Sequence, residues 1–317
     1  MIDISIIIVN WNVKDLLDNC LASLHNGTVA INQPQENLPV IEIIVIDSGS
    51  TDDSLQMIRD KYPDVRLLPQ NENVGFTRGN NIGFREAKGR YLFLLNPDTE
   101  IIDSAIPTLF HYMEAYTDVG IIGTHTLNTD GTHQSTRRRF PTLITGIFES
   151  TWLSTYAPQS IDQRYKMLDT DDSAILEVDW VQGSAMLVRR EVYETLGGLD
   201  EGYVMYSEEM DWCKRAKDAG WKVVYHGEAL ITHHSGKSSD QVGALKHIHF
   251  HTSKLRYFRK YHGYGTYLTL RVIILLLFTW QMILEAIKGL LGHKRDMRLQ
   301  RVKVYWQVLQ NGLKAQV

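Results

Sequence analysis

Apolar runs alternate with amphipathic segments along the first 125 residues of the chain. The runs are short and rich in Ile, Val and Leu, which is typical of buried strands, and the segments between them carry apolar residues at helical spacing. A helix is also expected after Ser50–Thr51, which can cap it. The patterns predict strands at residues 4–9, 41–47, 65–68, 91–95 and 119–123, and helices at residues 13–24, 78–88 and 105–116. Such alternation predicts an α/β fold with a mainly parallel sheet.

The pattern is weaker in the middle of the chain. Residues 128–173 are richer in Gly, Thr, Pro and Asp, and we expect loops there. Regular structure resumes afterwards with strands at residues 175–181, 184–188, 223–225 and 230–232, and with a helix at residues 208–219 that ends at Gly220.

The C-terminal part is more apolar. Residues 272–284, VIILLLFTWQMIL, form a run of 13 residues without a charge. A spanning helix needs about 20 apolar residues, so this run crosses a bilayer only if Arg271 reaches the surface and residues 264–270 are included. The Tyr and Trp side chains around it favour the membrane interface. We favour a helix that lies in the membrane plane, with a buried core or dimer helix and a true span as the alternatives.

Charge is unevenly distributed. From Lys254 to the C-terminus there are 12 Lys or Arg and 2 Asp or Glu, about +10, against about −14 for the remainder. A basic tail suits an anionic membrane surface, and a solvated basic helix is the alternative. No nucleic-acid motif accompanies the tail, so we expect no nucleic-acid partner. We therefore expect a catalytic domain at residues 1–262 and a basic, apolar helical region for membrane association at residues 263–317.

The two cysteines and the N-terminal sequence indicate in which cellular compartment the protein is expected. Cys20 and Cys213 are too far apart in sequence to indicate a metal site or a disulfide framework, so a reducing cytoplasm is expected. The N-terminal MIDISIIIVN has no basic segment before its apolar run, which predicts a strand and not a signal peptide.

Polar side chains follow three of the predicted strands. The first is followed by Asn10–Trp11–Asn12, the second ends at Asp47–Ser48, and the strand at residues 91–95 is followed by Asn96–Pro97–Asp98. Ligands of α/β sheets bind beyond the carboxyl ends of the strands. The three ends therefore predict a shared ligand crevice.

Carboxylates mark two of these ends. Asp47 can accept hydrogen bonds from a nucleobase or a ribose, although an Asx-turn before the next helix explains it at least as well. Asp98 follows a proline and can hold Mg²⁺ or Mn²⁺ beside a diphosphate, with a turn-forming Asp as the alternative. Between them, Asn73–Gly83 is rich in glycine, and Arg78 can pair with a phosphate. Its spacing fits neither the Walker loop nor the dinucleotide fingerprint, so neither ATP nor NAD is indicated.

Seven segments, in this order, resemble family 2 inverting glycosyltransferases of the GT-A fold: SIIIVNWN, VIDSGSTDDS, NENVGFTRGNN, YLFLLNPDT, GSAMLVRREVYETLGGLDE, YSEEMDWCKRAKDAGW and ITHHSGKSS. The resemblance covers roughly residues 4–262 and is strongest to the bacterial rhamnosyltransferase-like branch that builds surface polysaccharides. It implies a Rossmann-like nucleotide-diphospho-sugar transferase fold, to which this chain adds a C-terminal helical extension.

The resemblance implies roles for the donor-side residues. Val9 and Asn12 would line the base and ribose pocket, with Asp47 on the pyrimidine. Asn96–Pro97–Asp98 matches the family's DxD-type motif with Asn in the first position, so Asp98 would be the principal ligand of Mg²⁺ or Mn²⁺. A second metal ligand, His233, is implied by the pattern Ala229-x-Ile231-x-His233-x-x-Gly236-x-Ser238. Without the family, a histidine at a strand end is more often structural.

Acceptor-side roles are implied as well. Glu209 in YSEEMD occupies the position of the catalytic base, which is normally Asp in this branch. Acidic residues at a helix start are also ordinary partners of the helix dipole. Asp211 would anchor its helix or reach the acceptor, and Trp180 with Gln182–Gly183–Ser184 would form a wall of the sugar and acceptor site. Arg137, Arg138 and Arg139 would contact a lipid diphosphate or a headgroup, or form a solvated charge run.

The resemblance thus implies an inverting, metal-dependent glycosyltransferase at the inner face of the cytoplasmic membrane. It would move a sugar, in first place rhamnose from dTDP-rhamnose, onto a lipid-linked saccharide. A UDP-hexose or UDP-N-acetylhexosamine donor is the first alternative, because uracil and thymine offer the same imide edge to Asp47. A sugar-1-phosphate nucleotidyltransferase would need a glycine-rich loop after the first strand, which VNWNVKD lacks. A non-catalytic sugar-nucleotide-binding protein would not need Glu209.

Overall fold

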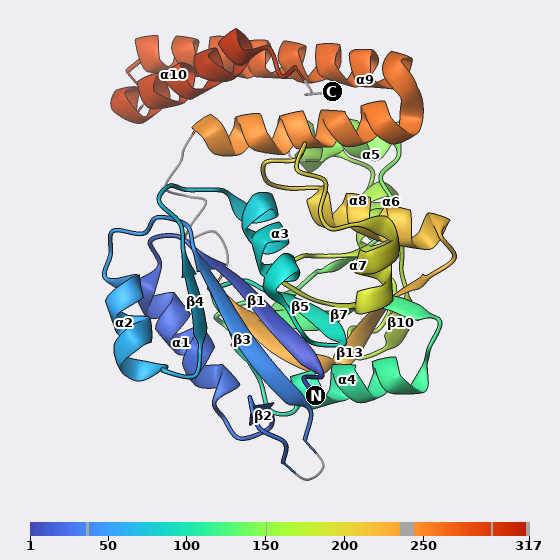
Figure 1. Ribbon diagram of the computed structural model, residues 1–317. Coiled ribbons are helices and arrows are strands. Elements are labelled where there is room, and N and C mark those ends of the chain that lie inside the picture. Colours follow the sequence, from blue (N-terminus) through green and yellow to red (C-terminus); the bar gives the residue numbers. More distant parts are fainter. Residues whose placement is uncertain (36–37, 150, 235–243, 293, 315–317) are drawn as a thin grey trace. The chain divides into compact units, whose positions relative to one another are not determined.

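Parallel strands from the N-terminal half of the chain build a mixed sheet with helices on both faces (Figure 1). The computed structural model describes residues 1–35, 38–149, 151–234, 244–292 and 294–314. The chain divides into two units. Unit 1 comprises residues 1–140, 166–201 and 208–238, and unit 2 comprises residues 141–165, 202–207 and 239–317.

The sheet belongs to unit 1 and has 11 strands within the described residues, in the order β10-β13-β7-β12-β5-β1-β3-β2, with β4 on β3, β6 on β13 and β8 on β7. The strands are β1 (Ile4–Asn10), β2 (Ala30–Ile31), β3 (Val40–Asp47), β4 (Arg66–Pro69), β5 (Tyr91–Leu95), β6 (Thr99–Ile101), β7 (Val119–Leu127), β8 (His133–Gln134), β10 (Ile175–Glu177), β12 (Ala185–Arg189) and β13 (Lys222–His233). A second, two-stranded sheet pairs β9 (Arg137–Arg138) with β11 (Trp180–Val181).

Strand register brings the predicted polar ends to one edge. β1 runs parallel to both β3 and β5, with Ile4 beside Ile41 on one side and beside Tyr91 on the other. Asn10 lies beside Asp47 in this register. Because parallel strands end at the same edge, the residues after β1, β3 and β5 share one end of the sheet.

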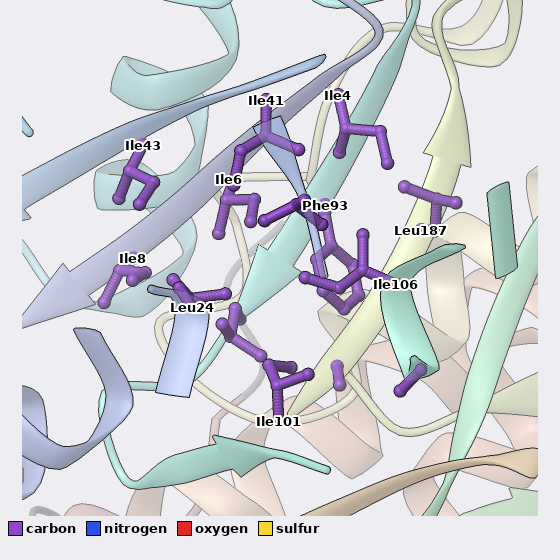
Figure 2. Packing of buried hydrophobic residues seen from close by; sticks show 14 of the residues in the cluster. Ile4, Ile6, Ile8, Leu24, Ile41, Ile43, Phe93, Ile101, Ile106 and Leu187 are labelled. Carbon is purple, nitrogen blue, oxygen red and sulfur yellow. The ribbon is translucent and has the colours of Figure 1, made fainter. Parts of the chain in front are cut away.

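Apolar residues on alternate positions of the strands bury both faces of the sheet. One face packs against α1 (Lys14–Leu24), α2 (Ser54–Lys61) and α4 (Ala105–Ala115), and Figure 2 shows the isoleucines of β1 and β3 within that cluster. The other face packs against α3 (Phe76–Glu86), α7 (Arg190–Leu196) and α8 (Glu208–Asp218). Unit 1 is therefore a three-layer α/β structure, as the sequence predicts.

Unit 2 is helical. It contains α5 (Leu143–Phe148), the 3₁₀ helix η1 (Trp152–Tyr156), most of α6 (Gln159–Lys166), α9 (Ala244–Leu290) and α10 (Arg295–Asn311). Lys254 is buried in this unit, where its ammonium donates to the carbonyl oxygen of Glu149 at 2.7 Å and lies 3.5 Å from the Glu149 carboxylate. Of the described helices, α9 alone is long and apolar enough by length and composition to cross a membrane.

A kink at Gly263, with φ of 85°, divides α9 into a first arm (residues 244–262) and a second arm (residues 264–290). The arms fold back on each other, since the ring of Phe278 lies 5.2 Å from that of His251 and 6.0 Å from that of His247. α10 packs along the second arm, with Tyr305 5.6 Å from Phe278 (Figure 1). The expected boundary at residues 262–263 falls on this kink, and a separate role for residues 263–317 stays a prediction.

Three local expectations are wrong. Residues 128–173 are not all loops, because short elements from β8 to α6 form there and are too brief to leave a periodic pattern. The strands expected at residues 223–225 and 230–232 are one strand, β13, whose pairing register shifts between His226 and Leu230. Ser50 and Thr51 do not cap α2, whose preceding residue is Asp53.

Candidate active site

Asp47 and its neighbours form a closed hydrogen-bond cluster after β1 and β3. Asn10 donates its side-chain amide to Asp47 Oδ2 at 2.8 Å, and the Ser50 backbone donates to Asp47 Oδ1 at 2.9 Å. Asn12, in the left-handed region with φ of 51°, accepts from the Thr51 backbone at 2.7 Å. The fully buried Asp47 carboxylate thus accepts a backbone hydrogen bond three residues further on, in agreement with the turn-forming role given above as the alternative. Its contact with a nucleobase stays a prediction.

The segment after β5 brings Asp98 to His233. Oδ1 of Asp98 lies 3.2 Å from Nε2 of His233, and both side chains are buried. The pairing of β6 with β13, which sets His233 beside Thr99, produces this approach. The two expected metal ligands, 135 residues apart, therefore meet in one place.

Gln134 orients the His233 ring. Its Oε1 lies 2.8 Å from Nδ1 of His233, so it accepts the Nδ1 proton and leaves Nε2 to face Asp98. In that tautomer the lone pair of Nε2 faces the negatively charged carboxylate of Asp98, and the two groups repel each other. A cation bound between them, either a proton or a metal ion, removes this repulsion. Carboxylate and imidazole are ligands that Mn²⁺ and related divalent ions accept.

Asn96 adds an amide oxygen to this side of the site. Its Oδ1 is buried without a hydrogen-bond partner, as is the hydroxyl of Ser184, whose carbonyl oxygen accepts from the Asn96 backbone at 2.9 Å. Among the described residues, no third His, Cys, Asp or Glu joins Asp98 and His233. A divalent ion bound by one carboxylate takes its remaining ligands from phosphate oxygens and water, so the donor set fits such an ion in the presence of a diphosphate.

Glu209 lies in the first turn of α8, against Gly183. A Cβ on Gly183 would stand 3.4 Å from Cβ and 3.6 Å from Cγ of Glu209, so the two residues are in van der Waals range of each other. Oε2 of Glu209 is buried without a hydrogen-bond partner. Since Gly183 precedes Ser184, the Glu209 side chain and Asn96 both flank the segment Gln182–Ser184.

Burial raises the pKa of the Glu209 carboxyl above its usual value. The backbone N–H groups of Glu209, Gly183 and Met210 and the charge of Arg138 act in the opposite direction, but they are weaker. A carboxylate with a raised pKa is a better proton acceptor, which is the property that a general base requires.

Asp211 and Trp180 have structural partners within unit 1. Asp211 is fully buried and accepts from Nε of Arg215 at 2.8 Å, and Arg215 also donates to the carbonyl oxygen of Leu196 at 2.8 Å. This geometry supports the helix-anchoring alternative for Asp211. Trp180 donates its indole N–H to the carbonyl oxygen of Arg139 at 3.0 Å and leaves its ring half-exposed. Contacts of Asp211, Trp180 and Gln182 with an acceptor stay predictions.

The glycine-rich segment 73–83 has a packing role. Gly79 and Gly83 lie inside α3, where a Cβ would stand 2.7 Å from Val9 and 2.4 Å from Ile7. The two glycines therefore let α3 approach β1 closely, and they form no phosphate loop. Arg78 lies in the first turn of α3 and is exposed, so its pairing with a phosphate stays a prediction.

The arginine run at residues 137–139 is not a solvated charge run throughout. Arg137 is fully buried, donates to Asp172 at 2.7 Å and to the carbonyl oxygen of Thr170 at 3.0 Å, and stacks 4.7 Å from the ring of Tyr225. It cannot contact a lipid diphosphate. Arg139 is the exposed member of the run.

The predicted site residues thus form a donor-side and an acceptor-side group. The first holds Asp98, His233 and Asn96, the second holds Glu209 and Gly183, and Ser184 links them. Sequence reasoning missed Gln134, which orients His233 from 99 residues away. No local pattern marks such a residue, because its function depends on the pairing of β8 with β7.

Comparisons with known proteins bear on these groups. A sequence model described as Glycosyl transferase family 2 matches residues 5–197. The match holds Asp47, Asp98 and Gly183, whereas Glu209 and His233 lie beyond it. An N-acetylglucosaminyl-diphospho-decaprenol L-rhamnosyltransferase of Mycobacterium tuberculosis is 29% identical over 248 residues, which cover 74% of this chain and 76% of that protein.

Two further proteins extend the comparison. The rhamnosyltransferase WbbL of Escherichia coli K12 is 30% identical over 162 residues, which cover 48% of this chain and 57% of that protein. The mannosyltransferase PcManGT of Pyrobaculum calidifontis, solved in complex with GDP-Man and Mn²⁺, is similar with a TM-score of 0.55 at 13% sequence identity, over 99% of this chain and 76% of that one. At this identity the similarity concerns the fold, and the predicted fold class is confirmed.

Proposed function

Because the chain belongs to glycosyl transferase family 2, we propose that it is an inverting, metal-dependent enzyme that transfers a sugar from a nucleotide-diphosphate donor to a lipid-linked saccharide. The observation that carries the proposal is the approach of Asp98 to His233 at 3.2 Å. The backbone of Asn96 donates to the carbonyl oxygen of Ser184, and Gly183, which precedes Ser184, lies beside Glu209 with its buried carboxylate oxygen. A non-catalytic binding protein would need no such carboxylate.

Rhamnose from dTDP-rhamnose is the donor that we propose. Two relatives bear the name of rhamnosyltransferases, and the mycobacterial one is named for a decaprenol-diphosphate acceptor. A lipid-linked saccharide in cell-surface polysaccharide synthesis is the corresponding acceptor. A UDP-hexose or UDP-N-acetylhexosamine is the alternative donor, because Asp47 meets the same imide edge in uracil and in thymine.

Glu209 acts as the base in the proposed mechanism. Its carboxylate takes the proton of the acceptor hydroxyl while that oxygen attacks the anomeric carbon from the side opposite the leaving diphosphate. The carbon–oxygen bond to the nucleoside diphosphate breaks as the new glycosidic bond forms, so the anomeric configuration inverts. The raised pKa of Glu209 suits this step.

Asp98 and His233 hold the leaving group's side of the site. A bound Mg²⁺ or Mn²⁺ supplies Lewis-acid stabilisation of the departing diphosphate. Asp98 contributes the charged ligand, Gln134 keeps Nε2 of His233 turned towards it, and the amide oxygen of Asn96 is free of competing hydrogen bonds. Arg78, exposed at the start of α3, is proposed to pair with the diphosphate.

The proposed place of action is the inner face of the cytoplasmic membrane. A lipid-linked acceptor is confined to the bilayer, and the segment from Lys254 onward carries about +10 of charge. Anionic headgroups attract such a segment. We therefore propose a peripheral enzyme on an anionic membrane surface.

A donor panel tests the proposed function. Nucleoside diphosphate release would be followed with dTDP-rhamnose and UDP-sugars, in the presence of lipid-linked acceptors and Mn²⁺. We expect acceptor-dependent release with one donor, abolished by EDTA and reduced at least a hundredfold in Asp98→Ala, which removes the charged metal ligand. Release that survives both EDTA and Asp98→Ala with every donor would overturn the metal-held diphosphate.

A further inference from the structure

The second arm of α9 exposes an apolar face. From Leu268 to Leu290 its large exposed hydrophobic residues recur at intervals of three or four positions and so lie on one side of the helix, and Leu291 follows directly after the helix. We call this set the apolar stripe: Leu268, Val272, Leu276, Trp280, Ile283, Ile287, Leu290 and Leu291. The buried residues of the same arm, among them Leu270, Ile274 and Phe278, lie on the opposite side. The stripe extends over about 35 Å at the rise of an α-helix.

Two of the three charged residues of this arm, Arg271 and Glu285, point to the protein, whereas Lys288 near its C-terminal end is exposed. Arg271 donates from Nε to the carbonyl oxygen of Gly312 at 2.7 Å, and Glu285 accepts from Arg298 at 2.5 and 2.6 Å. Both contacts are made with α10 and the residue that follows it. A helix that faces water presents its charges outward and its apolar residues inward. Up to Ile287 the second arm does the reverse, so its outward face suits an apolar medium over that length.

The packing of α10 limits the orientation of the second arm relative to a bilayer. The contacts Arg271–Gly312 and Glu285–Arg298 fix α10 alongside the arm over residues 271–285. Exposed cations lie on α10 at Arg295, Arg301 and Lys303 and directly before it at Lys294, and they do not enter a hydrocarbon core. If the arm crossed the bilayer, it would carry these cations into the core. An arm lying parallel to the surface keeps them at the headgroups.

Charge selects lipid over a second copy of the chain as the occupant. Cations flank the stripe in the sequence, with Arg259 and Lys260 before it and Lys294 and Arg295 after it, and Lys288 lies near its C-terminal end. A second copy seated on the stripe would bring the same positive charges against these. Anionic headgroups complement them, and the half-exposed ring of Trp280 has the amphipathic character of membrane-interface residues.

We propose that the apolar stripe inserts, parallel to the membrane surface, into one leaflet of an anionic bilayer while α10 stays in the headgroup layer. The inference deepens the proposed location of the enzyme, but it is argued from unit 2 by itself. Binding to lipid can therefore be tested without donor or acceptor, and its failure is distinct from a failure of sugar transfer.

Flotation with vesicles containing phosphatidylglycerol tests the stripe. In the full chain, Leu276→Gln with Ile283→Gln removes two exposed apolar side chains, and we expect at least a tenfold loss of vesicle partitioning. Leu168→Gln with Ile175→Gln is the matched control, because both residues are similarly exposed hydrophobics of unit 1, and it should leave partitioning unchanged. Equal partitioning of both double variants and the wild type overturns the proposal.

Depth-dependent quenching separates an in-plane arm from a span. Both native cysteines are buried, so a fluorophore can be attached at Leu268→Cys, Leu276→Cys or Ile287→Cys, with Gln310→Cys on α10 as the water-side control. We expect equal, shallow quenching by nitroxide lipids at the three stripe positions and weaker quenching at residue 310, which the headgroup layer surrounds. Deep quenching at residue 276 with shallow quenching at residues 268 and 287 would overturn the in-plane arrangement.

Two further measurements complete the test: removal of cations from the protein, compared on anionic and neutral vesicles, and the oligomeric state. Replacing Lys294, Arg295 and Lys303 by Ser should weaken partitioning on the order of fivefold per cation on anionic vesicles and should have no effect on neutral ones. Sedimentation of the wild type and of Leu276→Gln with Ile283→Gln, without lipid, reports on a second copy. A dimer that dissociates only in the stripe variant, together with unchanged vesicle binding, would assign the stripe to self-association and contradict the proposal.

Discussion

At the scale of single residues, the site combines the buried pair Asp98–His233, the proposed metal ligands, with the buried carboxylate of Glu209. Asp98 and His233 are both buried, with Oδ1 of Asp98 3.2 Å from Nε2 of His233, and Gln134 orients the His233 ring through Nδ1. Glu209 carries a buried oxygen without a hydrogen-bond partner. Unpartnered or closely opposed polar atoms cost stability, so their presence in one region is expected of a binding site and not of a structural core.

Two adjacent histidines offer a matched test of metal binding. His233 faces Asp98 inside the site, whereas His234 lies 2.7 Å from Glu100 with that carboxylate more exposed. We expect His233→Gln to weaken Mn²⁺ binding in the presence of nucleoside diphosphate by about 10–100-fold, and His234→Gln to weaken it less than threefold, as measured by electron paramagnetic resonance. Equal losses in the two variants would remove the distinction between the histidines.

The raised pKa of Glu209 predicts a dependence of stability on pH. In the unfolded chain this carboxyl ionises near pH 4.3, whereas in the folded protein it holds its proton to higher pH. Between the two values the unfolded state binds fewer protons, so the contribution of Glu209 to the free energy of unfolding falls as pH rises. The stability of Glu209→Gln relative to the wild type should therefore rise with pH above the pKa of the unfolded carboxyl, while the variant loses transfer activity by about 10²–10⁴-fold.

Denaturant unfolding at a series of pH values measures this effect. The exposed Glu228 provides the control, and Glu228→Gln should follow the wild type within about 0.5 kcal/mol at each pH. A pH-independent difference between Glu209→Gln and the wild type would argue against a buried, shifted carboxyl. In the wild type, the acid limb of kcat/KM should lie above the range of an ordinary Glu.

At the scale of elements, short strands position most of the site. β6 and β8 contain three and two residues, yet they place Thr99 beside His233 and bring Gln134 next to its ring. The longer β1, β3 and β5 were predictable from their apolar runs, whereas β6, β8 and β9 were not, because two or three residues show no periodicity. The edge where β1, β3 and β5 end could be predicted, but the pair Asp98–His233 followed only from the family resemblance.

The burial of the Arg137 guanidinium, which lies on the two-residue strand β9, could not be predicted from the sequence. Its partners Thr170 and Asp172 lie 33 and 35 residues further along the chain. Arg137→Met should lower the free energy of unfolding by about 2–3 kcal/mol, because hydrogen bonds to carbonyl oxygens and the ion pair with Asp172 are lost. Arg139→Met should cost less than about 0.5 kcal/mol, since that side chain is about half exposed. Chemical denaturation of both variants measures the difference, and equal losses would contradict the structural role of Arg137.

At the scale of the whole molecule, the proposed transfer site and the proposed membrane-binding face belong to different units of the chain. Unit 1 holds the sheet, the pair Asp98–His233 and Glu209, and unit 2 holds the apolar stripe and the basic segment from Lys254 onward. The charge asymmetry and the apolar run were visible in the sequence. The inward direction of Arg271 and Glu285, which favours an in-plane arm, was not, because composition does not show which side of a helix packs.

Nuclear magnetic resonance of the reaction mixture, with the donor that the panel identifies and a lipid-linked acceptor, tests the central claim most directly. The coupling constants of the transferred sugar report its anomeric configuration from the first turnovers. An inverting transfer with Glu209 as base predicts a product of configuration opposite to that of the donor, and product formation slowed by about 10²–10⁴-fold in Glu209→Gln. A product that retains the donor's configuration, or one formed at the wild-type rate by Glu209→Gln, would contradict it.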